Sequence, residues 1–437
     1  MFFKKTAIAL FLIASLALVF GGVVVAQEEV ELNILALKMD STQYIDEKTN
    51  EWIEQYEKEH DVEVSVNWEY LAEEDARAHA VEDMATGTGY YQIAQVGTQH
   101  ITLMAANDWL VPVEDYFTED YRADEFVEAV ETGASYDGKM YGVPIYHEAT
   151  HLFYRHDVFE ELGIEPPETL AGMKEKAKMI TEETEMAGVV LRGRRGAGLN
   201  HVSWKQFLHA YGGKWLKDFE RPYEPAFNSE EGIKATKWYA EMIRNYAPEG
   251  SQTAHWREAQ AMFMSGEAAM MIDATSISRR VLTDESSQVK GDVSFKLIPK
   301  GPEGRYPWYF SWNLGISKPG TEGLTREVAA DYVMWATSPE MKIDMMEDLG
   351  VLPARETTLN SDKAEEVYGD PNMSNWLSNT IKSLNIEEAA ENPVIAKVPE
   401  WPAIGDTIGI QLEEIFTGSK TVEEGLSEAA KTIEQDF

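Results

Sequence analysis

The chain has 437 residues, and its 76 acidic residues outnumber 38 basic residues to give a formal net charge of -38. A surface this acidic repels nucleic acid and anionic lipid head groups, which excludes DNA, RNA and membrane-surface binding. No cysteine is present, so disulfides, thiolate zinc sites, a Cys nucleophile and a lipid-anchored N-terminal Cys are excluded too.

Residues 1–26 have the pattern of a secretory signal peptide. Lys4 and Lys5 precede an apolar stretch that a glycine pair interrupts, and Val24-Val25-Ala26 places small residues at the cleavage positions. An uncleaved anchor is the alternative, because the stretch approaches the ~18–20 residues that span a bilayer. We expect cleavage before Gln27 and a soluble periplasmic or extracellular protein that is not a lipoprotein.

Strand and helix patterns alternate from the start of the mature chain. Residues 30–37 and 62–70 alternate as strands do, and residues 90–97 form a short apolar run that ends in glycine. Between them, residues 44–56 repeat apolar side chains every three or four positions, and residues 73–87 favour a helix with a glycine stop. This β-α-β-α-β order predicts an α/β layer architecture with a parallel sheet.

The alternation continues to the end of the chain, where residues from Arg326 onward are mostly helical. No repeat or low-complexity linker interrupts it, so two α/β lobes woven from discontinuous segments fit better than separate domains in a row. The predicted strands are 139–145, 151–155, 187–193, 268–274, 293–299 and 312–317, and the predicted helices are 167–184, 203–213, 229–246 and 257–265.

Residues 147–151 read His-Glu-Ala-Thr-His, the H-E-x-x-H string of zinc metallopeptidases. That chemistry requires both His side chains on one face of a helix. Pro144 just before it and the alternation of residues 151–155 favour a strand instead. In an extended segment the two His side chains lie roughly 13 Å apart and cannot share one ion. We therefore predict no metal site here.

The segment around this string resembles bacterial extracellular solute-binding proteins, the sugar-type receptors of ABC importers. In that family a G-K-x-Y-G-x-P strand leads into a crossover between lobes, then an L-x-Y-R/N-x-D-x-F segment and a helix after P-P-x-T. The order and spacing of several motifs extend the resemblance over nearly the whole mature chain. They are residues 137–170, AMFMSGEAAMMID (261–273), WNLGISKPG (312–320), AADYVMWATSPEM (329–341), LGVLPARETTL (349–359) and GSKTVEEGLSEAAKTIEQ (418–435).

The resemblance implies a two-lobed periplasmic-binding-protein fold with the ligand in a cleft between lobes joined by crossing hinge strands. It places residues 27–146 plus 313–357 in the first lobe and residues 147–312 plus 358–437 in the second. The expected ligand is a sugar or polyol, held by aromatic stacking and polar contacts. The implied partners are the membrane permease subunits of an ABC importer, and we expect a monomer that needs no cofactor.

The first implied ligand contacts lie where strands reach the cleft. Glu148 lies at the first crossover, where a family member carries a ligand-contacting glutamate; a solvated hinge carboxylate is the alternative, and Tyr146 and His147 are weaker candidates. Ligands of open α/β sheets gather at the carboxyl ends of strands. Ordinary loop polarity is the alternative for the polar residues expected at these ends, which are Asp40, Gln43, Gln95, Thr98 and Gln99.

Residues 191–204 form a basic, glycine-rich loop in a very acidic chain. Its glycine spacing and the missing Lys-Ser/Thr ending exclude a phosphate-binding P-loop. The resemblance to polyol and sugar receptors makes Arg194, Asn200 and Trp204 candidate contacts beside the cleft, together with Arg192. Simple pairing of Arg192 or Arg195 with nearby carboxylates is the alternative.

The remaining candidates lie in the second half of the chain. Ser276 takes the place of a stacking Trp that a family member carries beside this turn, and Trp308 and Trp312 at the second crossover are candidates to replace that platform. A core position is the alternative for such tryptophans. The full second-half set is Trp256, Asp273, Ser276, Trp308, Trp312, Arg355 and Trp401.

Two other functions remain open at this point. A secreted hydrolase would be either the zinc type or a glycosidase with paired carboxylates, but with 76 acidic residues such pairs arise by chance. A receptor for a non-sugar solute, such as a peptide, an amino acid derivative or a glycerophosphodiester, is the other. We predict a non-enzymatic receptor, as the resemblance implies. The aromatic residues near the crossovers favour a sugar as its ligand.

Overall fold

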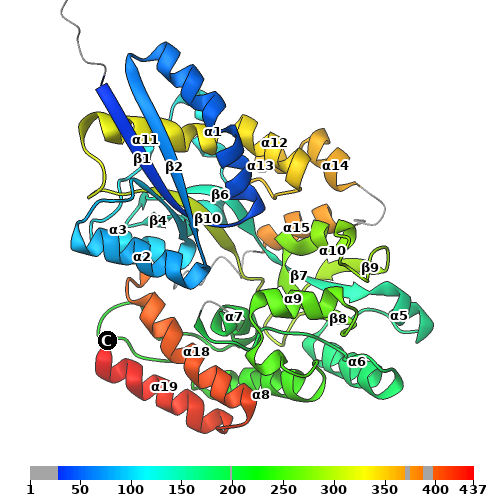
Figure 1. Ribbon diagram of the computed structural model, residues 1–437. Coiled ribbons are helices and arrows are strands. Elements are labelled where there is room, and N and C mark those ends of the chain that lie inside the picture. Colours follow the sequence, from blue (N-terminus) through cyan, green and yellow to red (C-terminus); the bar gives the residue numbers. More distant parts are fainter. Residues whose placement is uncertain (1–27, 197–198, 370–374, 387–396) are drawn as a thin grey trace, which may run out of the picture.

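The computed structural model describes residues 28–196, 199–369, 375–386 and 397–437, so the expected signal peptide lies outside the described residues. The chain folds into two α/β lobes, each built around its own sheet (Figure 1). Among the described helices, none is long and apolar enough to cross a membrane.

The first lobe contains a five-stranded sheet in the order β2-β1-β3-β10-β6. β1 pairs in parallel with β2 and β3, whereas β10 is antiparallel to both of its neighbours. Helices cover both faces of parallel sheets, and the side chains of β3 and β10 are buried throughout. The strands are β1 (Glu28–Leu37), β2 (Val62–Leu71), β3 (Ile93–Gly97), β6 (Val143–Glu148) and β10 (Phe310–Ile316).

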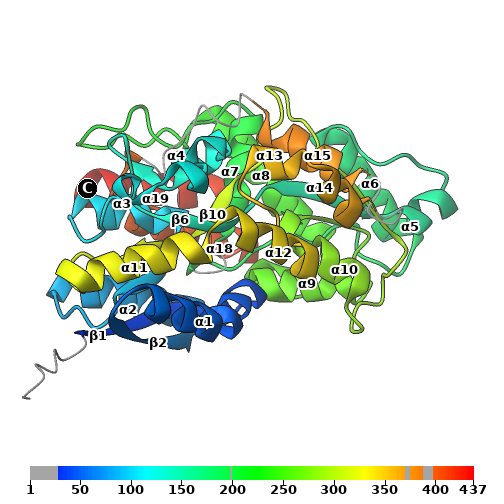
Figure 2. The same ribbon diagram turned by 90° about the horizontal axis from the view of Figure 1, so that it is seen from above.

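The helices of this lobe come from two separate parts of the chain, residues 40–133 and 323–349 (Figure 2). α2 ends at Gly87, whose φ of 68° is the left-handed conformation that terminates a helix, as the sequence predicted. The helices are α1 (Asp40–Glu59), α2 (Glu73–Thr86), α3 (Thr98–Ala106), α4 (Glu128–Gly133), α11 (Gly323–Ala336) and α12 (Pro339–Leu349), beside the hairpin of β4 (Ser135–Tyr136) and β5 (Lys139–Met140).

The second lobe contains a three-stranded antiparallel sheet with β7 (Thr150–Arg155) between β8 (Met270–Ala274) and β9 (Val293–Leu297). Only Ala149 separates β6 from β7, so the chain passes from one sheet directly into the other. The surrounding helices are α5 (His156–Glu161), α6 (Leu170–Glu183), α7 (Asn200–Ala210), α8 (Glu230–Asn245), α9 (Trp256–Met264) and α10 (Ser278–Thr283).

One predicted strand is wrong. Residues 187–193 form only two isolated bridges, Ala187 to Ala268 and Val190 to Met271. The apolar run is buried as a strand would be. It lies at the edge of the sheet beside β8 and pairs at only two positions, which is too few to form a ladder.

The C-terminal helices complete the second lobe. α15 packs on β7 and β9, and α18 and α19 pack on α7 and α8. α18 also contacts α3 of the first lobe, so the lobes touch beside the crossover strands. These three helices are α15 (Trp376–Leu384), α18 (Trp401–Thr417) and α19 (Val422–Asp436). Between the lobes, α13 (Glu356–Leu359) packs on α14 (Asp362–Tyr368), which contacts α12 on one side and α15 on the other.

Candidate ligand-binding site

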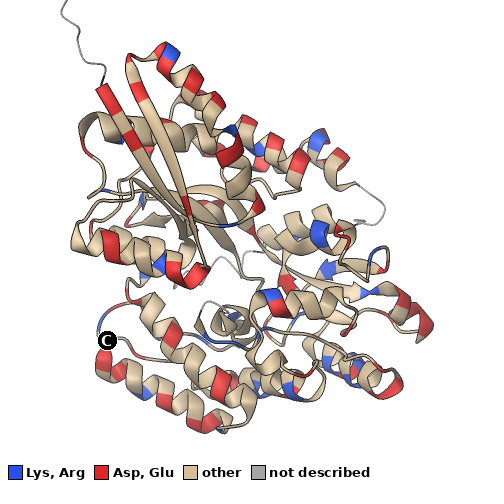
Figure 3. Ribbon diagram, in the orientation of Figure 1, with Lys and Arg blue, Asp and Glu red and all other residues tan. Residues whose placement is uncertain are grey.

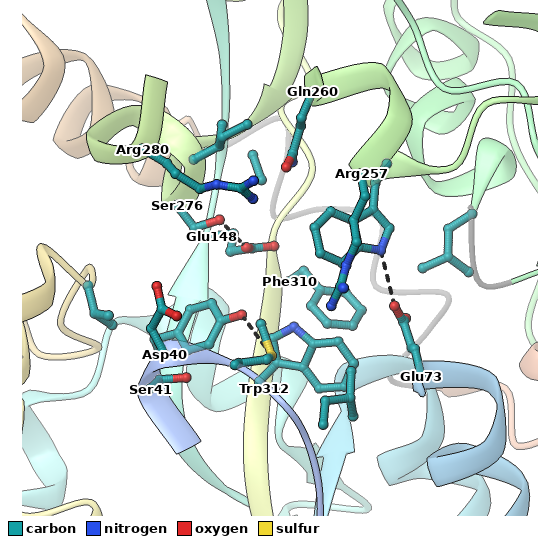
Figure 4. A pocket seen from close by; sticks show the side chains of 18 of the residues that line it. Asp40, Ser41, Glu73, Glu148, Arg257, Gln260, Ser276, Arg280, Phe310 and Trp312 are labelled. Atoms are coloured by element: carbon teal, nitrogen blue, oxygen red, sulfur yellow. Dashed lines mark hydrogen bonds between the residues drawn. The ribbon is translucent and has the colours of Figure 1, made fainter. Parts of the chain in front are cut away.

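A cavity of about 380 Å³ lies between the lobes, where β6 and β10 leave the first sheet. Figure 4 shows Asp40 and Ser41 on one side of it and Glu73 and Arg257 on the other, with Phe310 and Trp312 between them. Eight of the residues predicted from the sequence line this cavity: Asp40, Tyr146, Glu148, Arg192, Trp256, Ser276, Trp308 and Trp312.

The aromatic wall of the cavity follows from the geometry of one strand. Successive side chains of a strand point to opposite faces, so Phe310 and Trp312 of β10 share a face, with ring centroids 5.2 Å apart. Trp308 lies just before the strand and lines the cavity with them. Each of the three rings is at most 6% exposed, so they present a narrow, rigid apolar surface to a ligand.

Glu148, the last residue of β6, directs its carboxylate into the cavity, where the Ser276 hydroxyl donates a hydrogen bond to it. Burial raises the pKa of Glu148 to about 7, although the Ser276 bond and the nearby Arg192 charge act in the opposite direction. Near neutral pH this side chain therefore exchanges between a carboxylate that only accepts hydrogen bonds and an acid that also donates one.

Arg192 lines the cavity and is held from behind by Asp273. Its Nε donates to Asp273 Oδ2 at 2.9 Å and its Nη2 to Oδ1 at 2.5 Å, the bidentate geometry that fixes a guanidinium. Gln260 Nε2 also donates to Asp273, at 3.1 Å. Asp273 itself does not line the cavity and instead positions Arg192. The pairing alternative for Arg192 is therefore observed, and its contact with a ligand stays a prediction.

The N-terminus of α1 supplies a second polar edge. Asp40 begins the helix and lines the cavity, and the neighbouring Ser41 hydroxyl is buried without a hydrogen-bond partner among the described residues. A buried hydroxyl without a partner costs free energy. Ser41 therefore offers a hydrogen bond that a bound hydroxyl would satisfy.

Several predicted polar residues are occupied away from the cavity. The Gln95 amide oxygen accepts a hydrogen bond from Leu37 N at 2.8 Å, and the Thr98 hydroxyl bonds Ser311. The first bond links β3 to β1 and the second links the start of α3 to β10, and neither Gln95 nor Thr98 lines the cavity. Gln99 faces the Arg77 guanidinium, and Gln43 lies on α1 outside the cavity lining.

The basic loop and two tryptophans also lie elsewhere. Asn200 donates to Gly193 O and Gly409 O, which ties the loop to α18. Trp204 and Trp401 are at most 1% exposed and pack edge-to-face on Trp215 in the second-lobe core. This is the core alternative that the sequence left open for such residues.

Arg355 and Arg194 complete the predicted set. Arg355 is fully buried between the rings of Tyr121 and Phe126, 4.7 and 4.4 Å from their centroids. It therefore packs the first lobe rather than lining the cavity. Arg194 lines a neighbouring cavity and lies 3.8 Å from Glu74 across the lobe boundary.

The H-E-x-x-H residues form strands, as predicted. His147 belongs to β6 and His151 to β7, and the two strands lie in different sheets. Burial lowers the pKa of each to about 3. His151 bonds Thr380, and neither ring nitrogen of His147 has a partner among the described residues. The helix that a zinc peptidase requires is not formed here.

Sequence reasoning missed several residues that line the cavity. Phe310 had a signal, because it stands two positions before Trp312 in a predicted crossover. Arg257, Gln260 and Arg280 had none, because their approach to the cavity depends on how α9 and α10 face the first lobe. The polar and aromatic residues missed in this way include Ser41, Glu73, Arg257, Gln260, Arg280 and Phe310.

Two α/β lobes joined by crossing strands, with a cavity of aromatic and polar side chains between them, define a two-lobed ligand-binding protein. The chain belongs to the bacterial extracellular solute-binding proteins, because the sequence model of that family matches residues 40–343. This confirms the family that the motifs indicated. The members of this family are substrate-binding proteins rather than enzymes.

One curated relative is the mannitol-binding protein of Pseudomonas aeruginosa, 26% identical over 386 residues, which cover 86% of this chain and 87% of that protein. A solute-binding protein of Agrobacterium vitis S4 with bound D-mannitol superposes with a TM-score of 0.79 at 24% identity, covering 94% and 98% of the two chains. One from Agrobacterium radiobacter K84 in complex with ribitol gives 0.79 at 20%, covering 94% and 100%. At these identities the two structures establish the fold alone.

Proposed function

We propose that this protein is the extracytoplasmic receptor of an ABC importer and that it binds a sugar or polyol and delivers it to the membrane permease. The observation that supports this most directly is the composition of the cavity, in which the rings of Phe310 and Trp312 face charged side chains such as Asp40, Arg192 and Arg257. The mannitol-binding relative points to the same class of ligand.

The chemistry of such a ligand matches both kinds of wall. A sugar or alditol carries C–H groups that pack on aromatic faces and hydroxyls that each donate and accept hydrogen bonds. Arg192 and Arg257 only donate, Asp40 accepts, and Ser41 does both. A neutral solute with many hydroxyls satisfies these groups together, whereas an apolar solute would leave the buried ones without partners.

The receptor acts without catalysing a reaction, as a monomer, after removal of the signal peptide at residues 1–26. Its hinges are the two crossovers, near residues 144–149 and 310–314, and the lobes are residues 27–146 plus 313–357 and 147–312 plus 358–437. Ligand binding closes the lobes, and the closed form is the one that the permease recognises.

A thermal-shift screen followed by calorimetric titration tests the ligand class. The panel contains D-mannitol, ribitol, monosaccharides, maltose, sugar acids, amino acids and short peptides. A ligand present at 100 times its Kd stabilises the folded protein by ~2.7 kcal/mol, and we expect this for at least one sugar or polyol. Stabilisation by amino acids or peptides alone, or turnover of any ligand, would overturn the proposal.

A further inference from the structure

A second cavity, of about 560 Å³, adjoins the first at the boundary between the lobes. We call the first the inner cavity and the second the outer cavity. Its outer wall is strongly polar and mostly acidic, with Glu74, Asp75 and Glu258 beside Arg194 and His255. The two cavities have a common wall, formed by Leu37, Lys38, Glu73, Trp256 and Arg257.

A hydrogen bond between the lobes holds this common wall together. Trp256 Nε1, at the start of α9 in the second lobe, donates to Glu73 Oε2, at the start of α2 in the first, at 3.1 Å. The Arg257 guanidinium lies 4.7 Å from the centroid of the Trp256 ring, a cation–π contact that fixes the ring plane. Figure 4 shows this bond at the edge of the inner cavity.

Glu73 is itself anchored. Its Oε1 accepts a hydrogen bond from Arg77, and the two side chains are only 9% and 13% exposed. Breaking the pair would leave a charge in a poorly solvated site, so Glu73 presents Oε2 to Trp256 from a fixed position. Trp256 is therefore held as a partition between the two cavities rather than as a freely rotating surface ring.

We propose that Trp256, held by Glu73, limits the length of the ligand to a single hexitol- or monosaccharide-sized unit. The inner cavity alone lies near the lower end of the roughly 300–1,000 Å³ that small-molecule sites occupy. A second sugar unit that extended into the outer cavity would have to displace the common wall, in which Trp256 has the largest side chain. This inference rests on the proposed sugar or polyol function and specifies which ligands of that class fit.

The test compares Kd values for matched ligands of one and two units, D-glucitol with maltitol and D-glucose with maltose, and includes D-mannitol. The wild-type protein is expected to bind at least one single-unit compound and to discriminate against the longer partner by about 100-fold, as a steric block does. Trp256→Ala should narrow that ratio by at least about tenfold, chiefly because the longer ligand now binds.

Two further variants separate the partition from a simple contact. Trp256→Phe keeps a smaller ring but removes the Nε1 donor that Glu73 holds, so the discrimination should fall about two- to tenfold, less than in Trp256→Ala. Asp75→Asn changes the charge of the outer cavity without touching the Trp256 bond and should leave the binding of both ligands unaffected. Far-ultraviolet circular dichroism and melting curves verify folding of each variant.

Each result bears on one of the two proposals. Wild-type protein that binds maltitol or maltose as tightly as the single units overturns the length limit, and so does a Trp256→Ala variant that weakens both ligands equally. If Trp256→Ala does not fold, a Trp256→Phe variant that keeps the full wild-type discrimination overturns it as well. Wild-type protein that binds no sugar or polyol at all overturns the proposed function instead.

Discussion

Glu148 is the residue whose chemistry depends most on its surroundings. It accepts a hydrogen bond from Ser276 and faces the cavity. Glu148→Gln keeps the size of the side chain and removes its charge. Above the Glu148 pKa of about 7, where the group is a carboxylate, the variant should lose roughly 1.5–3 kcal/mol of sugar or polyol binding. Calorimetric titration measures this difference, with Asp75→Asn as the charge-neutralising control outside this cavity. Unchanged affinity would remove Glu148 from the site.

Because His147 is buried, we expect the stability of the protein to depend on pH. Burial lowers its pKa from 6.5 to about 3, so the unfolded chain binds more protons between these values, and the free energy of unfolding falls as pH decreases below about 6.5. For one such His the loss reaches about 2 kcal/mol at pH 5, at 1.36 kcal/mol per pKa unit. His147→Gln should therefore flatten the pH dependence of urea unfolding between pH 6.5 and 4. Parallel curves for wild type and variant would contradict it.

At the scale of single elements, β10 both crosses between the lobes and forms the aromatic wall. Trp312 contacts Phe310 and lies 5.4 Å below the Arg77 guanidinium. We expect Trp312→Ala to weaken sugar or polyol binding at least tenfold and to cost about 3–5 kcal/mol of stability, as buried Trp truncations do. Trp312→Phe retains a ring and should recover most of the stability. Normal affinity with lost stability would assign Trp312 to the core alone.

Local patterns predicted most elements but only part of the site. Periodicity located β1, α2 and α8 well because each is determined by its own residues, and the strand pattern answered the H-E-x-x-H question. Whether a tryptophan such as Trp204 or Trp312 lies in a core or a cavity depends on distant segments. The same holds for Arg257 and Arg280, which reach the cavity only because α9 and α10 face the first lobe.

At the scale of the whole molecule, the order of motifs predicted two lobes and a cleft because it preserves the order in which the chain visits each sheet. The contacts that position the cleft residues could not be predicted this way. Arg192 is held by Asp273 from a strand 81 positions later, and Glu73 meets Trp256 across 183 positions. The first pairing depends on packing within the second lobe and the second on the orientation of the two lobes, and no local pattern encodes either.

The net charge of -38 predicts that the stability of the folded protein depends on salt concentration. Asp and Glu side chains lie on the helices of both lobes (Figure 3), and their mutual repulsion destabilises the compact state at low ionic strength. We expect Tm to rise with sodium chloride from dilute buffer to about 0.15 M, where the Debye length is ~8 Å. Iso-osmotic sucrose controls for solute exclusion. A Tm that stays flat or falls with salt would refute the repulsion argument.

Closure of the lobes is the last prediction, and it follows from bonds that cross their boundary. Besides the Trp256–Glu73 bond, Arg279 Nη1 on α10 donates to Asp348 O on α12 at 2.6 Å. Opening at the crossovers breaks both bonds, while a bound sugar or polyol adds contacts from Asp40 on one lobe and Arg192 on the other. Ligand should therefore lower the radius of gyration in small-angle X-ray scattering.

Arg279→Gln provides the matched variant, because it weakens a bond between the lobes without changing the cavity lining. A ligand pays for closure with part of its binding free energy. The variant should accordingly show a larger radius of gyration without ligand, the same radius as the wild-type protein at saturation, and a higher Kd. Tight binding with an unchanged radius of gyration in both proteins would mean that the lobes do not move relative to each other. That result would contradict the hinge model.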